Sequence, residues 1–276
     1  MSIKKILILS ILSVSIFGCD QVSFGLEDPI ESYSAREIYD KADSKLKQKN
    51  FMKAAEYYGE IERLYPYSEW AKRGLIMQAF SFHQSLDYPN TRSAAQRYLD
   101  FYPAADDAAY AQYLLALSYY DQIDEIGRDQ GVATNALEAL RVIIDRYPNS
   151  EYSQVAKLKF DRTLDHLATK EMEIGRYYLE KGHYTAAVNR FRIVIEDFKS
   201  TNQTPEALHR LVESYLSLGL TEEAQSAGAV LKLNYKSTDW YNDTNNLLSG
   251  QGLKPVPFGG NWLVTVYRQM IKGQWL

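Results

Sequence analysis

The stretch YYLEKGHYTAAVNRF, residues 177–191, decides the fold of this chain. Apolar residues recur at helical spacing on both sides of Lys181-Gly182-His183, which is a turn signal because glycine ends helices readily. Ala186 and Ala187 are small enough to let the second helix approach the first closely. The stretch therefore predicts a tight helical hairpin.

The same pattern recurs along the chain, each time with an aromatic residue followed by Pro or Lys. The five aromatic residues are Tyr65, Tyr102, Tyr147, Phe198 and Tyr235. The residues four positions before them are Ile61, Tyr98, Ile143, Val194 and Leu231. The residues twelve positions before the Pro or Lys are all small, and they are Ala54, Thr91, Ala136, Ala187 and Ala224. Strand-like alternation is scarce, so the chain is predicted to be all-α.

The Pro/Lys positions are 37, 45, 51 and 37 residues apart. Two of these spacings are close to the length of a tetratricopeptide repeat, and the other two are clearly longer. We expect an α-solenoid of about five tetratricopeptide-like helical hairpins over residues 33–246, wound as a right-handed superhelix and stabilised by stacking. Two segments lengthen the period. Residues 121–131, DQIDEIGRDQG, are interpreted as a solvated insertion, and residues 157–182 as one long helix.

Cys19 is the only cysteine of the 276 residues, and it follows an apolar run preceded by two lysines. Ile16-Phe17-Gly18-Cys19 resembles a bacterial lipobox, although Phe17 departs from the usual small residue. We therefore expect a signal peptide at 1–18 and lipidation of Cys19, which holds the domain to a bilayer by its acyl chains. A chance cysteine after an ordinary signal peptide is the alternative.

Composition and spacing argue against several classes of protein. Removal of residues 1–18 leaves 29 basic and 35 acidic side chains, so nucleic acid is not an expected partner. The four histidines are dispersed without metal-ligand spacing, and no phosphate-binding or nucleophile motif occurs. No enzyme activity, catalytic residue, metal or cofactor is expected.

The segments FDRTLDHLATKEMEIGRYYLEKGHYTAAVNRFRIVIEDF, 160–198, and PEALHRLVESYLSLGLTEEA, 205–224, resemble the BamD (ComL) family. The motifs KEMEIGRYY and AAVNRF carry the resemblance, which extends over nearly the whole mature chain except residues 250–276. BamD proteins are lipoproteins of the bacterial β-barrel assembly machinery. The resemblance implies a periplasmic solenoid tethered to the outer membrane, with BamA, other assembly lipoproteins and unfolded outer-membrane proteins as partners.

In the BamD family the N-terminal and C-terminal repeats bind different partners, so the resemblance implies segments with separate binding roles. The expected segments are a signal peptide at 1–18, a lipidated linker at 19–32, a substrate-binding half at 33–120, a half that binds the BamA POTRA domain nearest the barrel at 121–246, and an extension at 247–276. In that extension, residues 261–273 are expected to form a short amphipathic helix that caps the solenoid, or else a disordered tail. Binding to a second subunit of the complex is another alternative, and membrane contact is less favoured than a cap or a disordered tail.

Candidate site residues follow from charge and aromatic character. The predicted BamA-interface residues are Glu171, Glu173, Arg176, Asn189, Arg190 and Arg192. An internal salt bridge of Glu171 or Glu173 with Arg176, and an Arg192–Glu196 pair on one helix, are the alternatives. Tyr67 and Trp70 are the substrate-groove candidates, because they lie just past a proline at a hairpin edge, although most tyrosines here are expected to be core.

The repeat pattern and the lipobox also fit a different role in the cell envelope. A generic tetratricopeptide adaptor lipoprotein for peptidoglycan synthesis or pilus biogenesis has the same repeat pattern. Asp20 favours inner-membrane retention by the enteric sorting rule, which other lineages do not follow uniformly.

Overall fold

The computed structural model describes residues 28–123 and 130–257, which form a short 3-10 helix and eleven α-helices without a strand. The 3-10 helix is Ile30–Ser32. The α-helices are α1 Ala35–Lys47, α2 Phe51–Leu64, α3 Glu69–Gln84, α4 Tyr88–Phe101, α5 Ala108–Tyr120, α6 Gly131–Arg146, α7 Glu151–Glu180, α8 Tyr184–Asp197, α9 Thr204–Ser217, α10 Thr221–Asn234 and α11 Asp239–Gly250.

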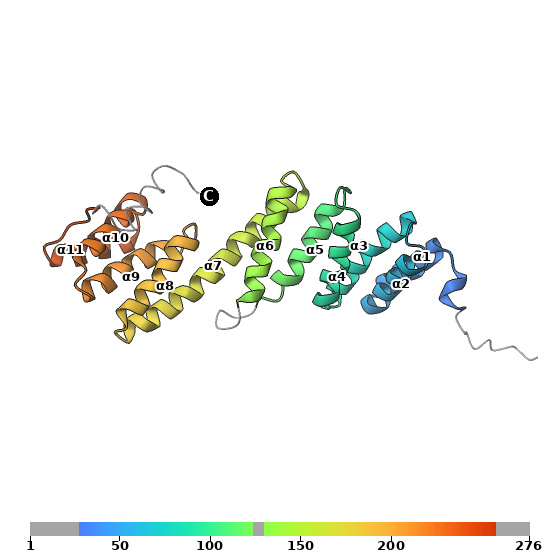
Figure 1. Cartoon of the computed structure of the whole chain (residues 1–276), viewed down its shortest axis with the longest axis horizontal. Coiled ribbons are helices and arrows are strands. Elements are labelled where there is room, and N and C mark those ends of the chain that lie inside the picture. Colours follow the sequence, from blue (N-terminus) through green and yellow to red (C-terminus); the bar gives the residue numbers. More distant parts are fainter. Residues whose placement is uncertain (1–27, 124–129, 258–276) are drawn as a thin grey trace, which may run out of the picture.

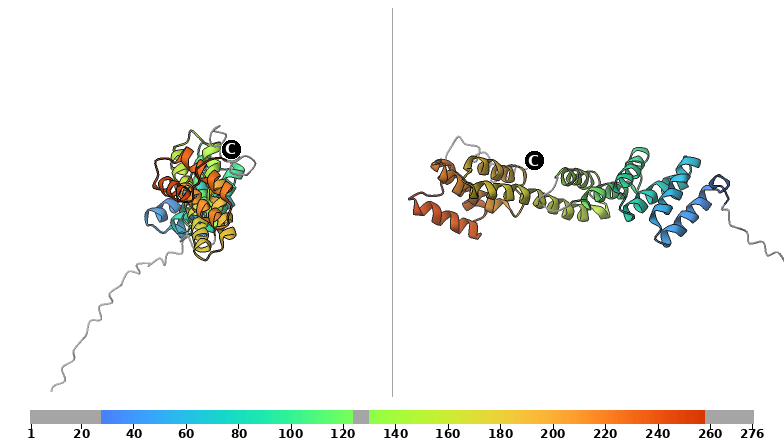
Figure 2. Two further views of the ribbon diagram at one scale, coloured as in Figure 1. Left: turned by 90° about the vertical axis from the view of Figure 1, so that its left-hand side faces the viewer. Right: turned by 90° about the horizontal axis from the view of Figure 1, so that it is seen from below.

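The helices stack in sequence order along one long axis, so that α1 and α11 lie at opposite ends (Figure 1). Each helix from α2 to α10 packs mainly against the helices before and after it, and α11 covers α9 and α10. The views in Figure 2 show the same elongated stack from its end and from below. The helices pair as five hairpins, with α11 added at the end, which confirms the predicted helical solenoid.

The repeat positions found in the sequence are the core of the stack. All five small residues and all five residues four positions before the aromatic residue are fully buried. The five aromatic residues follow directly after α2, α4, α6, α8 and α10, and each donates its backbone N–H to the carbonyl four positions earlier. One repeated pattern thus sets both the packing face and the end of the second helix in every hairpin.

The turn predicted at Lys181-Gly182-His183 lies where α7, the first helix of a hairpin, ends, and two other hairpins turn at equivalent positions. Gly182 and Gly219 have φ values of 73° and 76°, which glycine adopts without the steric penalty of a side chain. Between α1 and α2 the corresponding residue is Lys49, with a φ of 59°. The side chain of Asn50 then caps α2 by accepting a hydrogen bond from the Lys53 N–H at 3.3 Å.

The predicted long helix is α7, which begins six residues earlier than expected and spans 30 residues. Its first half packs against α6, through Ala156 and Phe160, while its second half packs against α8. The length of α7 explains the 51-residue spacing between two of the repeats. The 45-residue spacing comes from the insertion before α6, most of which lies outside the described residues.

Three predictions concern residues that the structure does not describe, namely the signal peptide, Cys19 and the helix at 261–273. Within 28–123 and 130–257, none of the helices combines the length and the apolar character needed to cross a membrane.

Candidate protein-interaction site

The second half of α7 and its partner α8 bring two predicted interface residues together. Arg190 Nη1 lies 2.9 Å from Glu171 Oε2, and the two side chains are 37% and 15% exposed. The pair is therefore a partly buried link between the helices that still presents charge to solvent. Its contribution to stability is modest because exposure screens the attraction.

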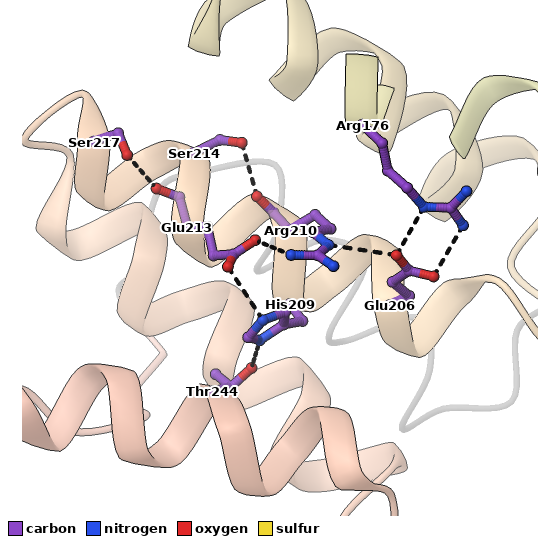
Figure 3. Close-up of polar contacts among 8 residues, drawn as sticks. All are labelled: Arg176, Glu206, His209, Arg210, Glu213, Ser214, Ser217 and Thr244. Atoms are coloured by element: carbon purple, nitrogen blue, oxygen red, sulfur yellow. Dashed lines mark hydrogen bonds and ion pairs between the residues drawn. The ribbon is translucent and has the colours of Figure 1, made fainter. Parts of the chain in front are cut away.

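Arg176 faces α9 instead of the acids of its own helix. Its Nε and Nη2 donate to the two carboxylate oxygens of Glu206 at 2.9 and 3.0 Å (Figure 3). This two-bond arrangement is the strongest form of an arginine–carboxylate contact. The predicted alternative, a salt bridge of Arg176 with Glu171 or Glu173, is wrong, because the arginine side chain leans across to the neighbouring helix.

The contact of Arg176 is part of a polar network that links α7, α9 and α11 (Figure 3). Arg210 Nε lies 3.4 Å from Glu206 Oε1, and Arg210 Nη1 lies 2.8 Å from Glu213 Oε2. The buried imidazole of His209 lies 3.5 Å from Glu213 and 2.8 Å from the Thr244 hydroxyl of α11. The network therefore fixes α9 and α11 relative to α7.

The network lowers the pKa of two of its carboxyl groups. Burial alone raises the pKa of Glu206, but hydrogen bonds and charge from Arg176 and Arg210 outweigh it and give a net lowering. The pKa of Glu213 is lowered in the same way, since hydrogen bonds from His209 and Arg210 outweigh the effect of burial.

Acid is therefore expected to destabilise the C-terminal helices through this network. A carboxyl group whose pKa is lower in the folded chain stabilises the fold above its unfolded pKa, and this contribution disappears as the pH falls below about 4. Glu206→Gln is expected to reduce the free energy of unfolding at pH 7 by about 1 kcal/mol. It should also make that free energy fall less steeply as the pH decreases. Urea unfolding followed by circular dichroism between pH 3 and 7 measures both effects. If the free energy of unfolding of the variant falls with pH as steeply as that of the wild type, this account is contradicted.

The remaining interface candidates divide into one paired and two unpaired side chains. Arg192 contacts Glu196 on its own helix at 2.9 Å, the local pairing that the sequence offered as an alternative. Glu173 and Asn189 are exposed, and within the described part of the chain no ion pair or side-chain hydrogen bond engages them. These two side chains therefore remain available to a partner.

Sequence reasoning missed the network residues on α9. Their spacing carried a signal, because Glu206 and Arg210, and His209 and Glu213, are four positions apart in PEALHRLVES and share a helix face. No signal in the sequence pointed to Glu206 as the partner of Arg176, because the two residues are 30 positions apart.

The two predicted groove aromatics have different surroundings. Tyr67 is completely exposed and lines a hollow of about 340 Å³ between the α2–α3 and α4–α5 edges. Phe101, which is not among the predicted groove residues, lines the same hollow and is 64% exposed. Trp70 instead packs partly buried against Tyr39, with ring centroids 5.1 Å apart, in the N-terminal core.

A helical-repeat stack with an aromatic hollow in one half and exposed charged groups in the other defines the class of the protein as a helical scaffold for other proteins. Among residues 28–123 and 130–257, no group of three or more His, Cys, Asp or Glu side chains is placed to hold a metal ion.

Comparison with known proteins identifies the family. Residues 31–231 match the YfiO family of outer-membrane lipoproteins. The chain is 41% identical over 249 residues to the outer-membrane protein assembly factor BamD of Caulobacter vibrioides, covering 89% of this chain and 81% of the relative. It is 39% identical over 205 residues to BamD of Rickettsia prowazekii, covering 74% and 82%. The chain therefore belongs to the BamD family of outer-membrane protein assembly factors.

A solved structure that matches part of the chain is PilW, described as a widely conserved type IV pilus biogenesis factor. It covers 76% of this chain and 97% of its own, with 12% identity and a TM-score of 0.33. A TM-score this low supports no conclusion about function.

Proposed function

We propose that this chain is a non-enzymatic lipoprotein subunit of the outer-membrane β-barrel assembly complex, which scaffolds BamA and receives unfolded outer-membrane proteins. The observation that carries the proposal is 41% identity to a BamD protein over 89% of the chain. The family match, residues 31–231, contains the first four helical hairpins and all but the last three residues of the fifth. The family membership favours this role over an adaptor for peptidoglycan synthesis or pilus biogenesis.

The BamA-binding surface is proposed to lie on α7 and α8, which carry the six predicted charged and polar residues. Glu173 and Asn189 are exposed, while Arg190 and Glu171 hold each other and keep part of their surface in solvent. An arginine held in place by an internal carboxylate loses little conformational freedom when it binds a partner. The POTRA domain nearest the barrel is the proposed partner.

The membrane attachment is proposed to be the acylated Cys19 on the periplasmic face of the outer membrane. Fifteen residues, 20–34, separate it from the first hairpin, and a chain of this length reaches at most roughly 54 Å. The solenoid therefore stays close to the bilayer. Mass spectrometry of the mature N-terminus tests the anchor, since acylation adds the mass of the acyl chains to a peptide that begins at Cys19.

Substrate capture is proposed at the hollow beside Tyr67. Tyr67→Ala is expected to weaken binding of an extended peptide with a terminal aromatic residue about three- to tenfold, because an aromatic pair contributes about 0.5–1.5 kcal/mol beyond burial. Stability should change by less than about 0.5 kcal/mol at so exposed a site. Fluorescence anisotropy of a labelled peptide measures the affinity. Tyr177→Ala, which removes an exposed tyrosine in the other half, is the matched control.

The decisive test of the proposed function is purification of the tagged native protein in a gentle detergent, followed by identification of the associated proteins. Recovery of a POTRA-bearing β-barrel in near-equal amounts supports the assembly role and makes Asp20 a lineage difference in sorting. Recovery of inner-membrane or cell-wall proteins without that barrel contradicts the proposal and favours the adaptor.

A further inference from the structure

A groove of about 370 Å³ lies at the junction between the two halves of the solenoid. Its lining residues come from α6, α7, the end of α8 and the loop after it, and they are Arg141, Phe160, Leu164, Asp197, Lys199 and Ser200. Figure 1 shows the place, where the long α7 passes from α6 to α8. The regular stacking of hairpins is interrupted here because the length of α7 separates its two neighbours.

The groove combines apolar surface with one carboxylate that has no cationic partner among the described residues. Phe160 and Leu164 are partly buried, and the guanidinium of Arg141 lies 5.4 Å from the centre of the Phe160 ring. Partial burial, followed by the nearby charges of Glu196 and Glu171, raises the pKa of Asp197. Arg141 and Lys199 also line the groove and Asp197 is exposed, so apolar side chains suit Phe160 and Leu164, and a positive charge suits only the surface beside Asp197.

The segment 258–276 has that composition. Leu263, Val266, Tyr267 and Met270 recur at the spacing of one helix face, and the segment contains Arg268 and Lys272 but no acidic side chain. Apolar residues in this pattern require a surface to cover them. The segment lies outside the described residues, so its composition and its point of departure are what bear on its place.

The described chain departs close to the groove. The Lys254 carbonyl accepts a hydrogen bond from Gln225 Nε2 of α10 at 2.8 Å, and Pro255 lies against Gly228. From Gly228 to Tyr235, just beyond the end of α10, the helix rises roughly 10 Å. Tyr235 shares a second hollow with Lys199 and Ser200, which also line the groove. The 19 residues after Pro257 span up to roughly 60 Å when extended, so the groove is within reach.

We propose that residues 258–276 dock in the junction groove of their own chain. Their apolar face covers Phe160 and Leu164, and Arg268 or Lys272 lies beside Asp197. The docked segment ties the last hairpin back to α6 and braces the junction that α7 alone otherwise spans. This role is independent of BamA binding and of substrate capture.

Hydrogen–deuterium exchange of the full-length protein in detergent, read by mass spectrometry over residues 258–276, tests the docking. Wild-type amides in this segment are expected to exchange at least tenfold more slowly than an unstructured chain. Asp197→Lys and Leu164→Asp should each remove at least tenfold of that protection. Leu158→Asp is the matched control, because Leu158 lies on α7 but is 62% exposed and does not line the groove. It should leave the protection unchanged.

A second measurement disrupts the segment 258–276 and leaves the charge of the groove unchanged, with a cysteine at residue 164 as the probe. In a Leu164→Cys background, labelling of residue 164 by a thiol reagent is expected to be at least tenfold faster when Val266→Asp and Met270→Asp are added. Wild-type amides that exchange at the unstructured rate overturn the proposal. Protection that persists in both folded groove variants, with labelling insensitive to the tail, also overturns it and indicates that the segment binds elsewhere.

Discussion

Replacement of Phe191 by alanine is expected to lower the free energy of unfolding of the C-terminal half by about 3–5 kcal/mol. Phe191 is a fully buried side chain of α8 in the cluster that α7, α8, α9 and α10 share. Removal of the ring deletes its contacts and leaves a cavity that helices anchored on both sides cannot close. Urea denaturation followed by circular dichroism measures the loss. Phe101→Ala removes the same ring from an exposed site and should change stability by less than about 0.5 kcal/mol.

The size of this effect depends on Gly175, which makes room for the ring on α7. A Cβ atom at residue 175 would lie 2.8 Å from Phe191 Cδ1 and 2.9 Å from Cζ, distances that real Cβ contacts do not show. Gly175→Ala is therefore expected to destabilise by about 1–3 kcal/mol from overpacking, reduced by the better helix propensity of alanine. In a Phe191→Leu background the same change should be nearly neutral. Additive effects of the two substitutions contradict this close approach.

The fold could be predicted from the sequence because every hairpin repeats the same two constraints. Ala187 and Val194 are fully buried at the positions that the repeat assigns to helix packing, and Phe198 follows the last residue of α8, as its counterparts follow the other second helices. Such signals are local in sequence. They survive even where an insertion or the long α7 lengthens the spacing, since neither changes the face that a helix buries.

The candidate site was less predictable, because its contacts join residues from different helices. Arg176 could be recognised as a charged group on a helix face, but its partner Glu206 is fixed by how α9 packs beside α7. The aromatic residues show the same limit. Tyr67 and Trp70 share a hairpin edge in sequence, yet one is fully exposed and the other packs on Tyr39, because α3 turns Trp70 towards α1.

The internal pairing of Arg190 changes how its role in BamA binding must be tested. Arg190→Glu alone places a second carboxylate beside Glu171, whose charge already acts on Asp197, and so destabilises the α7–α8 contact. Weaker partner binding by this variant would then have two causes. The combined variant Glu171→Arg with Arg190→Glu restores an opposite-charge pair between the same helices and keeps the net charge, but it reverses the charges that a partner meets.

The combined variant is expected to melt at the wild-type temperature and to bind the POTRA domain nearest the barrel at least tenfold more weakly, or about 1.4 kcal/mol. Isothermal calorimetry measures the affinity and circular dichroism the melting. Arg36→Asp with Asp40→Arg, an equivalent exchange within an exposed pair of α1, should alter neither quantity. If the combined variant recovers both stability and affinity, Arg190 and Glu171 serve only the α7–α8 contact. The BamA surface must then rest on other side chains, with Glu173 and Asn189 the first to examine, because both are exposed and unpaired in the described chain.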